Sequence, residues 1–493
     1  MQYLINIKDE RQLPNIEAAL KIIDPNAVMV ANDQPSTGVD LELVVAYTPD
    51  FHVKVLAPGL SGPEKEWEYY DREILDRRYN ESDRKQRLKE LIRLGIITVA
   101  GKHFGKKPPW GILSGVRPTK IYHYLRDKGF TGSEIREKLL GIYDLAPRKA
   151  DLLLKVGRLQ EKYFDNGSQI GVYVGIPFCP TRCRYCSFAA VSLETHGHLV
   201  KGFLAALERE IEAMSSLCAE FGWRVESIYL GGGTPSSLEE EAFSKLLDLL
   251  NQAFFTASTV EYNVEAGRPE TVSRGKLAAM SRHGVNRISI NPQTMEESTL
   301  KEIGRGHSIR DIYEAVAMAR EFPELLLNMD LILGLPGENG AVFLESLQKV
   351  MTIGPENITI HTLAPKRAAA WRKNFTELQL GQAHDLTEAM ERAVGLLESD
   401  EYQPYYLYRQ RLILAELENI GFARSKQESV YNIQMMEERQ TILGLGGGAV
   451  TKWVVGPEHQ VYRHQNPKCP ATYGKRLEAE IVNKVQQTRL LLG

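Results

Sequence analysis

The chain has 493 residues, of which 43% are hydrophobic and 25% are charged, an ordinary composition that excludes a disordered or fibrous protein. Sixty Lys and Arg residues against sixty-three Asp and Glu residues give a net charge of −3, so the chain lacks the positive field expected of a nucleic-acid-binding protein. No apolar run reaches the ~18 residues of a membrane span, and the start has no basic and apolar leader. We therefore expect a cytoplasmic protein with no membrane insertion.

Residues 1–165 are predicted to form an N-terminal α+β and helical region. Extended runs at 2–7 and 41–47 lie on either side of a helical pattern over 13–23. The sequence from 73 to 94 is helical and charged. This region is expected to end at a short linker, Asn166-Gly167-Ser168.

Residues 166–375 alternate short β-rich runs with helix-length segments, which is typical of repeated βα units around a parallel sheet. Six units predict a partial (β/α)6 barrel, open on one side where a large flat substrate could enter. The expected strands cover 172–176, 227–230, 260–265, 287–290, 327–333 and 357–361.

Residues 376–493 are predicted to be mainly helical, with helices over 386–397 and 409–420, and to cover the open side of the barrel. The fold class is therefore α/β. Within the barrel, polar residues follow the predicted strands at the ends where parallel barrels build their sites. These residues are three cysteines, Gly231-Gly232-Gly233-Thr234, Glu265, Gln293, Asp330 and His361.

The three clustered cysteines, Cys179, Cys183 and Cys186, have the spacing C-x3-C-x2-C, which lets three thiolates from one loop bind one metal centre. A [4Fe–4S] cluster held by three cysteines keeps one iron open to a small molecule. Zinc is the alternative, but it normally takes a fourth Cys or His in a paired pattern, and none follows here. Unliganded core cysteines are the second alternative. Cys218 and Cys469 are isolated and are expected to be inert.

Four motifs, taken in this order, resemble the radical S-adenosylmethionine (SAM) superfamily. Within it the chain resembles the oxygen-independent coproporphyrinogen III oxidase (dehydrogenase) family, HemN-like and of the HemZ type, over residues 170–475. One departure is Gly175, where relatives commonly have His before the Ile-Pro-Phe-Cys sequence. The motifs are Tyr173 to Cys186, Tyr229-Leu230-Gly231-Gly232-Gly233-Thr234-Pro235-Ser236, Asp330-Leu331-Ile332-Leu333-Gly334-Leu335-Pro336-Gly337 and Leu443-Gly444-Leu445-Gly446.

The resemblance implies a [4Fe–4S] cluster on Cys179, Cys183 and Cys186, and one SAM molecule or two. Taken alone, the three glycines suit close approach of backbone to ligand or a tight turn, and Glu265 suits a ribose hydroxyl or an ammonium group. Any one of the polar residues could equally have a structural role. The SAM contacts implied by the family are Tyr173, Tyr185, Gly232, Gly233, Thr234, Glu265, Gln293, Arg305, Asp330, Ala364 and Val450.

The resemblance further implies a substrate, coproporphyrinogen III, an external one-electron donor and an electron acceptor. Two propionate side chains would each lose a hydrogen atom, CO2 and one electron, giving protoporphyrinogen IX. A haem-binding chaperone of the same family, or a radical enzyme for another large substrate, is the alternative.

Arginines and aromatic rings are the candidate substrate contacts, because guanidinium groups match carboxylates and rings match a flat ligand. We expect propionate contacts from Arg182, Arg184 or Arg305. Four tyrosines near residue 405 either line a tetrapyrrole pocket or form a helix-packing stripe, which we favour. They are Tyr402, Tyr405, Tyr406 and Tyr408.

Overall fold

The computed structural model describes residues 1–30, 39–164, 167–186, 188–364, 383–410 and 413–493. The chain divides into two compact units, Met1–Arg158 and Leu159–Gly493. The predicted boundaries after residues 165 and 375 lie outside the described residues, as does Asn166 of the expected linker. The division into three regions therefore stays a prediction.

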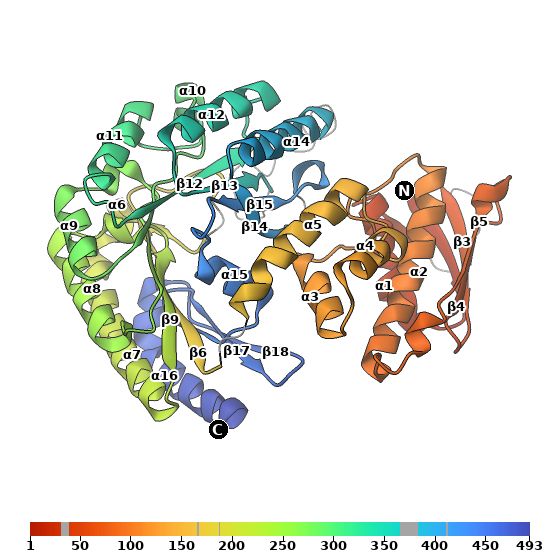
Figure 1. The fold of residues 1–493 in the computed structure, drawn as a ribbon, viewed down its shortest axis with the longest axis horizontal. Coiled ribbons are helices and arrows are strands. Elements are labelled where there is room, and N and C mark those ends of the chain that lie inside the picture. The colour runs from red at the N-terminus through yellow and green to blue at the C-terminus, as the bar shows by residue number, and fades with distance from the viewer. Residues whose placement is uncertain (31–38, 165–166, 187, 365–382, 411–412) are drawn as a thin grey trace. The chain divides into compact units, whose positions relative to one another are not determined.

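The first unit contains a five-stranded sheet with helices packed against it (Figure 1). The strand order is β2-β1-β3-β4-β5; β1 pairs in parallel with β2 and β3, whereas β3, β4 and β5 are antiparallel. The expected α+β unit is thus present up to residue 70. Its strands are β1 (Gln2–Ile7), β2 (Val28–Val30), β3 (Leu41–Tyr47), β4 (His52–Leu56) and β5 (Glu66–Tyr70).

Five helices complete this part of the chain, and α2 packs on both α1 and β4. The helix expected over 13–23 is confirmed, but the one expected over 73–94 begins later, at Glu81. Asn80 explains the shift, because its side chain accepts from the backbone N–H of Asp83, whose carboxylate accepts from that of Asn80 in return. The helices are α1 (Leu13–Ile23), α2 (Glu81–His103), α3 (Thr119–Asp127), α4 (Gly132–Gly141) and α5 (Pro147–Gln160).

The second unit is built on six parallel strands that lie side by side in chain order, which confirms the six predicted βα units. Buried Val, Ile and Leu residues dominate these strands, as expected where both faces of a parallel sheet are covered. The strands are β6 (Gln169–Ile176), β9 (Arg224–Gly232), β10 (Glu261–Glu265), β11 (Arg287–Ser289), β12 (Leu326–Leu333) and β13 (Asn357–Thr362).

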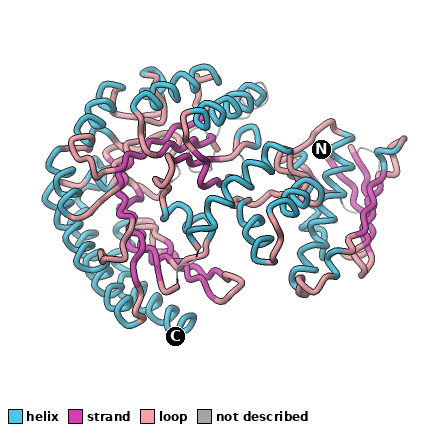
Figure 2. Tube along the Cα trace, viewed as in Figure 1, coloured by secondary structure: helices cyan, strands magenta, loops and turns pink. Residues whose placement is uncertain are grey.

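Helices cover the outer face of this sheet, and the strands themselves form the inner side (Figures 1 and 2). None of the helices in the described part of the chain is long and apolar enough to cross a membrane. The outer helices are α7 (Val200–Glu220), α8 (Glu240–Phe254), α9 (Arg274–Arg282), α11 (Ile309–Ala319), α12 (Gly340–Ile353) and α14 (Ala383–Ser399), and the shorter α10 (Glu297–Glu302) precedes α11.

The C-terminal region contains the predicted helix over 386–397, as α14, but it also contributes five strands that were not predicted and that extend the barrel sheet at both edges. β15 pairs antiparallel with β13 and carries β14, whereas β16 pairs in parallel with β6 and carries β17 and β18. No helix covers the described residues of 409–420, where a short 3-10 turn precedes β15. The added elements are β14 (Gln403–Tyr408), β15 (Asn419–Ala423), α15 (Val430–Glu437), β16 (Ile442–Gly446), β17 (Val450–Val455), β18 (Gln460–Gln465) and α16 (Pro470–Leu492).

The two edge strands of the resulting sheet, β14 and β18, do not pair with each other among the described residues. Among the described residues, the sheet is therefore an open one of eleven strands. This arrangement agrees with the partial barrel expected from the sequence.

Candidate functional site

A cavity of about 670 Å³ lies on the inner side of the second unit, at the carboxyl ends of the parallel strands. Every cofactor-binding or metal-binding residue predicted from the sequence lines it. The structure thus brings together residues from six strands and five loops. They are Tyr173, Cys179, Cys183, Tyr185, Cys186, Gly232, Gly233, Thr234, Glu265, Gln293, Arg305, Asp330, Ala364 and Val450.

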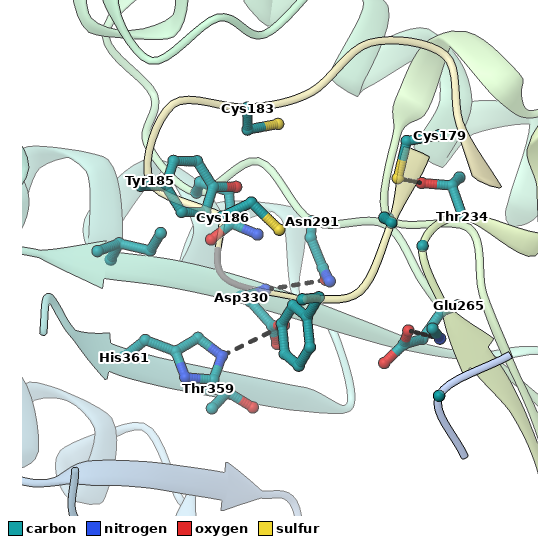
Figure 3. A pocket seen from close by; sticks show the side chains of 18 of the residues that line it. Cys179, Cys183, Tyr185, Cys186, Thr234, Glu265, Asn291, Asp330, Thr359 and His361 are labelled. Carbon is teal, nitrogen blue, oxygen red and sulfur yellow. Dashed lines mark hydrogen bonds and ion pairs between the residues drawn. The ribbon is translucent and has the colours of Figure 1, made fainter. Parts of the chain in front are cut away.

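Cys179 ends β7 (Phe178–Cys179), and Cys183 and Cys186 lie on the loop that leads from it to β8 (Val191–Ser192). The three thiols face one space (Figure 3). Two neighbouring side chains donate hydrogen bonds to sulfur: Thr234 Oγ1 to Cys179 Sγ at 3.4 Å, and Arg268 Nη1 to Cys183 Sγ at 3.3 Å. Donors of this kind are typical partners of thiolates that hold an iron–sulfur cluster. The donor set therefore fits a [4Fe–4S] cluster.

Spacing separates a cluster from a single metal ion. Thiolates on one tetrahedral zinc ion lie about 3.8 Å apart, because each Zn–S bond is about 2.3 Å long. Within the described residues, no three His, Cys, Asp or Glu side chains lie close enough to share one ion. Burial raises the pKa of the Cys179 thiol to about 11, and a bound metal centre would displace that proton.

Two glycines at the end of β9, Gly232 and Gly233, are required because the backbone around the end of β6 approaches them closely. A Cβ on Gly232, which has φ 111°, would lie 2.8 Å from the backbone nitrogen of Ile176, and one on Gly233 would lie 2.5 Å from the carbonyl oxygen of Phe178. This packing places the turn directly against the start of the cysteine loop. The glycines therefore serve both the packing and the cavity wall.

Gly175, where relatives carry His, lies against the glycine-rich end of β16. A Cβ at this position would lie 2.8 Å from the carbonyl oxygen of Gly447, and Gly447 N–H donates to the Gly175 carbonyl oxygen at 3.0 Å. Backbone thus occupies the space that a histidine side chain would need. Glycine fits this position because it has no Cβ to meet that carbonyl oxygen.

Glu265 ends β10 and is the acidic group nearest the glycine turn. The Tyr229 hydroxyl donates to Oε1 at 2.5 Å and the Gly232 N–H donates to Oε2 at 3.3 Å. Burial, with a smaller contribution from Asp330, raises the pKa of Glu265 to about 7. The carboxyl group therefore changes its charge near neutral pH.

We expect SAM to bind about tenfold more weakly at pH 6 than at pH 8, because a carboxyl with a pKa near 7 is mostly protonated at the lower pH and cannot accept from an ammonium or hydroxyl group. Calorimetric titration of the cluster-loaded protein at both pH values measures the ratio. The amino group of SAM also titrates, so Glu265→Gln is the control variant. Its binding should keep only the part of the pH dependence that comes from SAM itself. A ratio as large in Glu265→Gln as in the unaltered protein would contradict the assignment.

Asp330 on β12 forms a second polar centre with residues of the neighbouring strands. Its carboxylate lies 3.4 Å from His361 Nε2 and accepts from Asn328 Nδ2 at 3.0 Å, and its backbone N–H donates to Asn291 Oδ1 at 3.2 Å (Figure 3). Gln293 adopts φ 70°, an uncommon conformation for this residue type, and its buried Oε1 has no partner in the described part of the chain. Strain and an orphaned acceptor in one cavity are features of a ligand-binding wall.

Arg305 is buried, and its guanidinium donates to the Gly267 carbonyl oxygen at 2.7 Å and to the Tyr185 hydroxyl at 3.0 Å. These contacts hold it beside the cysteine loop. Of the other two candidate propionate contacts, Arg182 lines the cavity and Arg184 does not.

The tyrosines near residue 405 lie on strand β14, so the helix-packing stripe that we favoured is wrong. Side chains alternate along a strand, so Tyr406 and Tyr408 both line the cavity, where their rings stack with centroids 6.4 Å apart. The hydroxyl of Tyr405 instead accepts a hydrogen bond from Asn432. Tyr402 donates to the Pro355 carbonyl oxygen at 2.5 Å and does not line the cavity.

Several cavity residues were missed by the sequence analysis, and most of them come from the C-terminal elements. Tyr431 on α15 stacks on Tyr229 at 4.2 Å between ring centroids. His361 was singled out from the sequence as a polar residue at a strand end, but without an assigned role. The missed residues include Arg268, Asn291, Asn328, Tyr431, Asn432, Met435, Met436, Lys452 and Arg463.

Comparisons with known proteins agree with this geometry. Residues 173–350 match the family model of the radical SAM superfamily. The chain is 36% identical over 411 residues, 82% of each chain, to the oxygen-independent coproporphyrinogen-III oxidase-like protein HemZ of Bacillus subtilis. It is 30% identical to the heme chaperone HemW of the same organism, over 56% of this chain and 69% of that protein.

Among solved structures, the fold is similar to that of coproporphyrinogen III oxidase (HemN) from Escherichia coli, with a TM-score of 0.51. The match covers 66% of this chain and 73% of that chain at 22% sequence identity, so it concerns the fold.

Proposed function

Because the chain belongs to the HemN-like family of the radical SAM superfamily, we propose that it catalyses the oxygen-independent oxidative decarboxylation of coproporphyrinogen III to protoporphyrinogen IX. The observation that carries the proposal is the single cavity that joins the cysteine loop to an aromatic and basic wall from the C-terminal elements. A cavity of about 670 Å³ is in the size range of ligand sites.

Cys179, Cys183 and Cys186 would hold the cluster, and the strand ends around Glu265 and Asp330 would hold SAM. When bound, these two groups together supply a one-electron reduction and the radical that removes a hydrogen atom from the substrate. Acidic residues suit SAM because its sulfonium and ammonium groups are positive. The sequence motifs permit one SAM molecule or two.

The protein's part in the reaction is to orient one propionate at a time and to exclude water. Each –CH2–CH2–COO⁻ group loses a hydrogen atom, one CO2 and one electron and becomes a vinyl group, so each round needs an external electron acceptor. Stacked Tyr406 and Tyr408 offer a flat surface for the ring system. Five free cysteines and no disulfide among the described residues fit the reducing cytoplasm, where we place the reaction.

A haem chaperone is the second candidate, favoured by the similarity to HemW and by the side chains on the cavity wall. His361, Met435 and Met436 all line the cavity, and His and Met are the residue types that commonly bind haem iron. Stoichiometric haem binding without turnover of a porphyrinogen would distinguish this function.

An anaerobic assay tests the proposal. The protein is reconstituted with iron and sulfide, reduced, and supplied with SAM, coproporphyrinogen III and an electron acceptor, and the oxidised porphyrins are separated by carboxylate number. We expect SAM-dependent conversion from four carboxylates through three to two. SAM cleavage with all four carboxylates retained would overturn the substrate and leave the chaperone or another large substrate.

A further inference from the structure

Two cations stand directly opposite each other on the β17–β18 hairpin, where they line the cavity. Lys452 on β17 and Arg463 on β18 are register partners, a placement that costs stability between like charges unless a counter-ion is present. Glu438, which follows α15 and is 1% exposed, is that counter-ion.

Glu438 contacts both cations. Lys452 Nζ lies 3.1 Å from its Oε1, and Arg463 Nη2 donates to Oε1 at 2.8 Å and to Oε2 at 3.0 Å. Lys452 also donates to the Met435 carbonyl oxygen at 3.1 Å. One carboxylate between two cations leaves these three side chains with one net positive charge beside the cavity.

Arg463 carries the exposed part of that charge, because its side chain is 50% exposed whereas that of Lys452 is 6% exposed. Among the described residues its side chain pairs with Glu438 alone, through Nη2, so the N–H donors at Nε and Nη1 have no protein partner there. By contrast, the guanidinium of Arg268 is paired with Glu270, and that of Arg305 with Gly267 and Tyr185. Arg463 is thus poised to meet an anion that enters the cavity.

The hairpin cations lie on a different wall of the cavity from its carboxylates. Glu265 and Asp330 lie on the parallel strands, near the three arginines of the cysteine-loop side, and Lys452 and Arg463 lie on the hairpin at the sheet edge. The hairpin therefore offers an anionic ligand a basic wall apart from the carboxylates that would attract a cationic one.

We propose that Arg463, held in place by Glu438 and Lys452, binds a carboxylate of the substrate. The inference rests on the proposed function, in which the substrate carries four propionates. Glu438 engages Nη2, so Nε and Nη1 of Arg463 can donate a charge-assisted hydrogen bond to a carboxylate, and Arg463 would set which edge of the tetrapyrrole reaches the cysteine loop.

The test uses the cluster-loaded protein and two stable probes, coproporphyrin III and its uncharged tetramethyl ester in the same detergent. Fluorescence titration gives both affinities. Arg463→Gln should weaken coproporphyrin binding about tenfold and leave ester binding unchanged, since one charge-assisted hydrogen bond at a half-exposed site is lost. Arg463→Lys keeps the positive charge but lacks the guanidinium donors, and it should give a smaller loss of coproporphyrin affinity.

Arg489→Gln is the matched control, because Arg489 is a similarly exposed arginine that pairs with Glu220 on two parallel contacts outside the cavity. It should bind both probes as the unaltered protein does. If the unaltered protein binds neither probe, the proposed function is overturned. If it binds coproporphyrin and Arg463→Gln binds equally well, this inference alone is overturned. If Arg463→Gln does not fold, Arg463→Lys takes its place in the test. Coproporphyrin binding by Arg463→Lys equal to that of the unaltered protein would then overturn the inference.

Discussion

Replacing any one of Cys179, Cys183 and Cys186 with alanine is expected to abolish cluster binding and, with it, SAM cleavage. Three thiolates are the fewest that hold a cubane cluster with one open iron, and two leave a second iron without a protein ligand. Iron and acid-labile sulfide analysis after anaerobic reconstitution measures the loss, together with the visible absorption of the cluster.

The two remaining cysteines are the matched controls. Cys218 is buried in α7 and Cys469 is exposed just before α16, and neither lines the cavity. Cys218→Ala and Cys469→Ala should therefore keep the full iron and sulfide content. A normal cluster in Cys183→Ala would refute the assignment of the ligands.

Glu210→Gln is expected to lower the free energy of unfolding of the second unit by about 3–5 kcal/mol, the usual cost of leaving a buried charge without its partner. Glu210 is 0% exposed and its Oε1 accepts from Lys484 Nζ at 2.5 Å. The Tyr473 hydroxyl and the Gly446 N–H donate to its Oε2 at 2.6 and 2.7 Å. Glutamine keeps an acceptor oxygen but leaves Lys484 buried and unneutralised.

Urea denaturation measures this loss. Glu210→Gln combined with Lys484→Met should recover part of the stability, because both buried charges are then gone. Glu220→Gln, which breaks an exposed pair with Arg489, should change stability far less. A change in Glu210→Gln as small as that in Glu220→Gln would contradict the account.

The Glu210 contacts also connect stability to the site. Lys484 Nζ donates to the Gly444 carbonyl oxygen and Glu210 accepts from Gly446, so α7 and α16 together hold the glycine-rich strand β16. β16 in turn packs on Gly175 of β6 and leads to Val450 in the cavity. Loosening this buried pair should therefore also disturb the cavity wall next to the cysteine loop.

The parallel strands, most of their helices and the residues of the cofactor side could be predicted from the sequence alone. Each of these sequence features is local: three cysteines lie within eight residues, Glu265 ends an apolar run, and Asp330 is the one acidic residue within another. In a parallel sheet all such ends meet at one edge, so local patterns suffice to bring these residues together.

The C-terminal elements could not be placed in this way. Tyr406 and Tyr408 follow a pattern that suits a helix or a strand, and pairing of β14 with β15 at the sheet edge decides for a strand. Lys452 and Arg463 lie far from the motifs in the sequence, and only the pairing of β16 with β6 brings their hairpin to the cavity. The sequence by itself thus determined the α/β class and predicted the cysteine cluster and the acidic side chains of the candidate site, because those depend on short-range spacing and periodicity. The tertiary structure decided the aromatic and basic side, because long-range strand pairing depends on which sheet edge is left open and not on the local sequence.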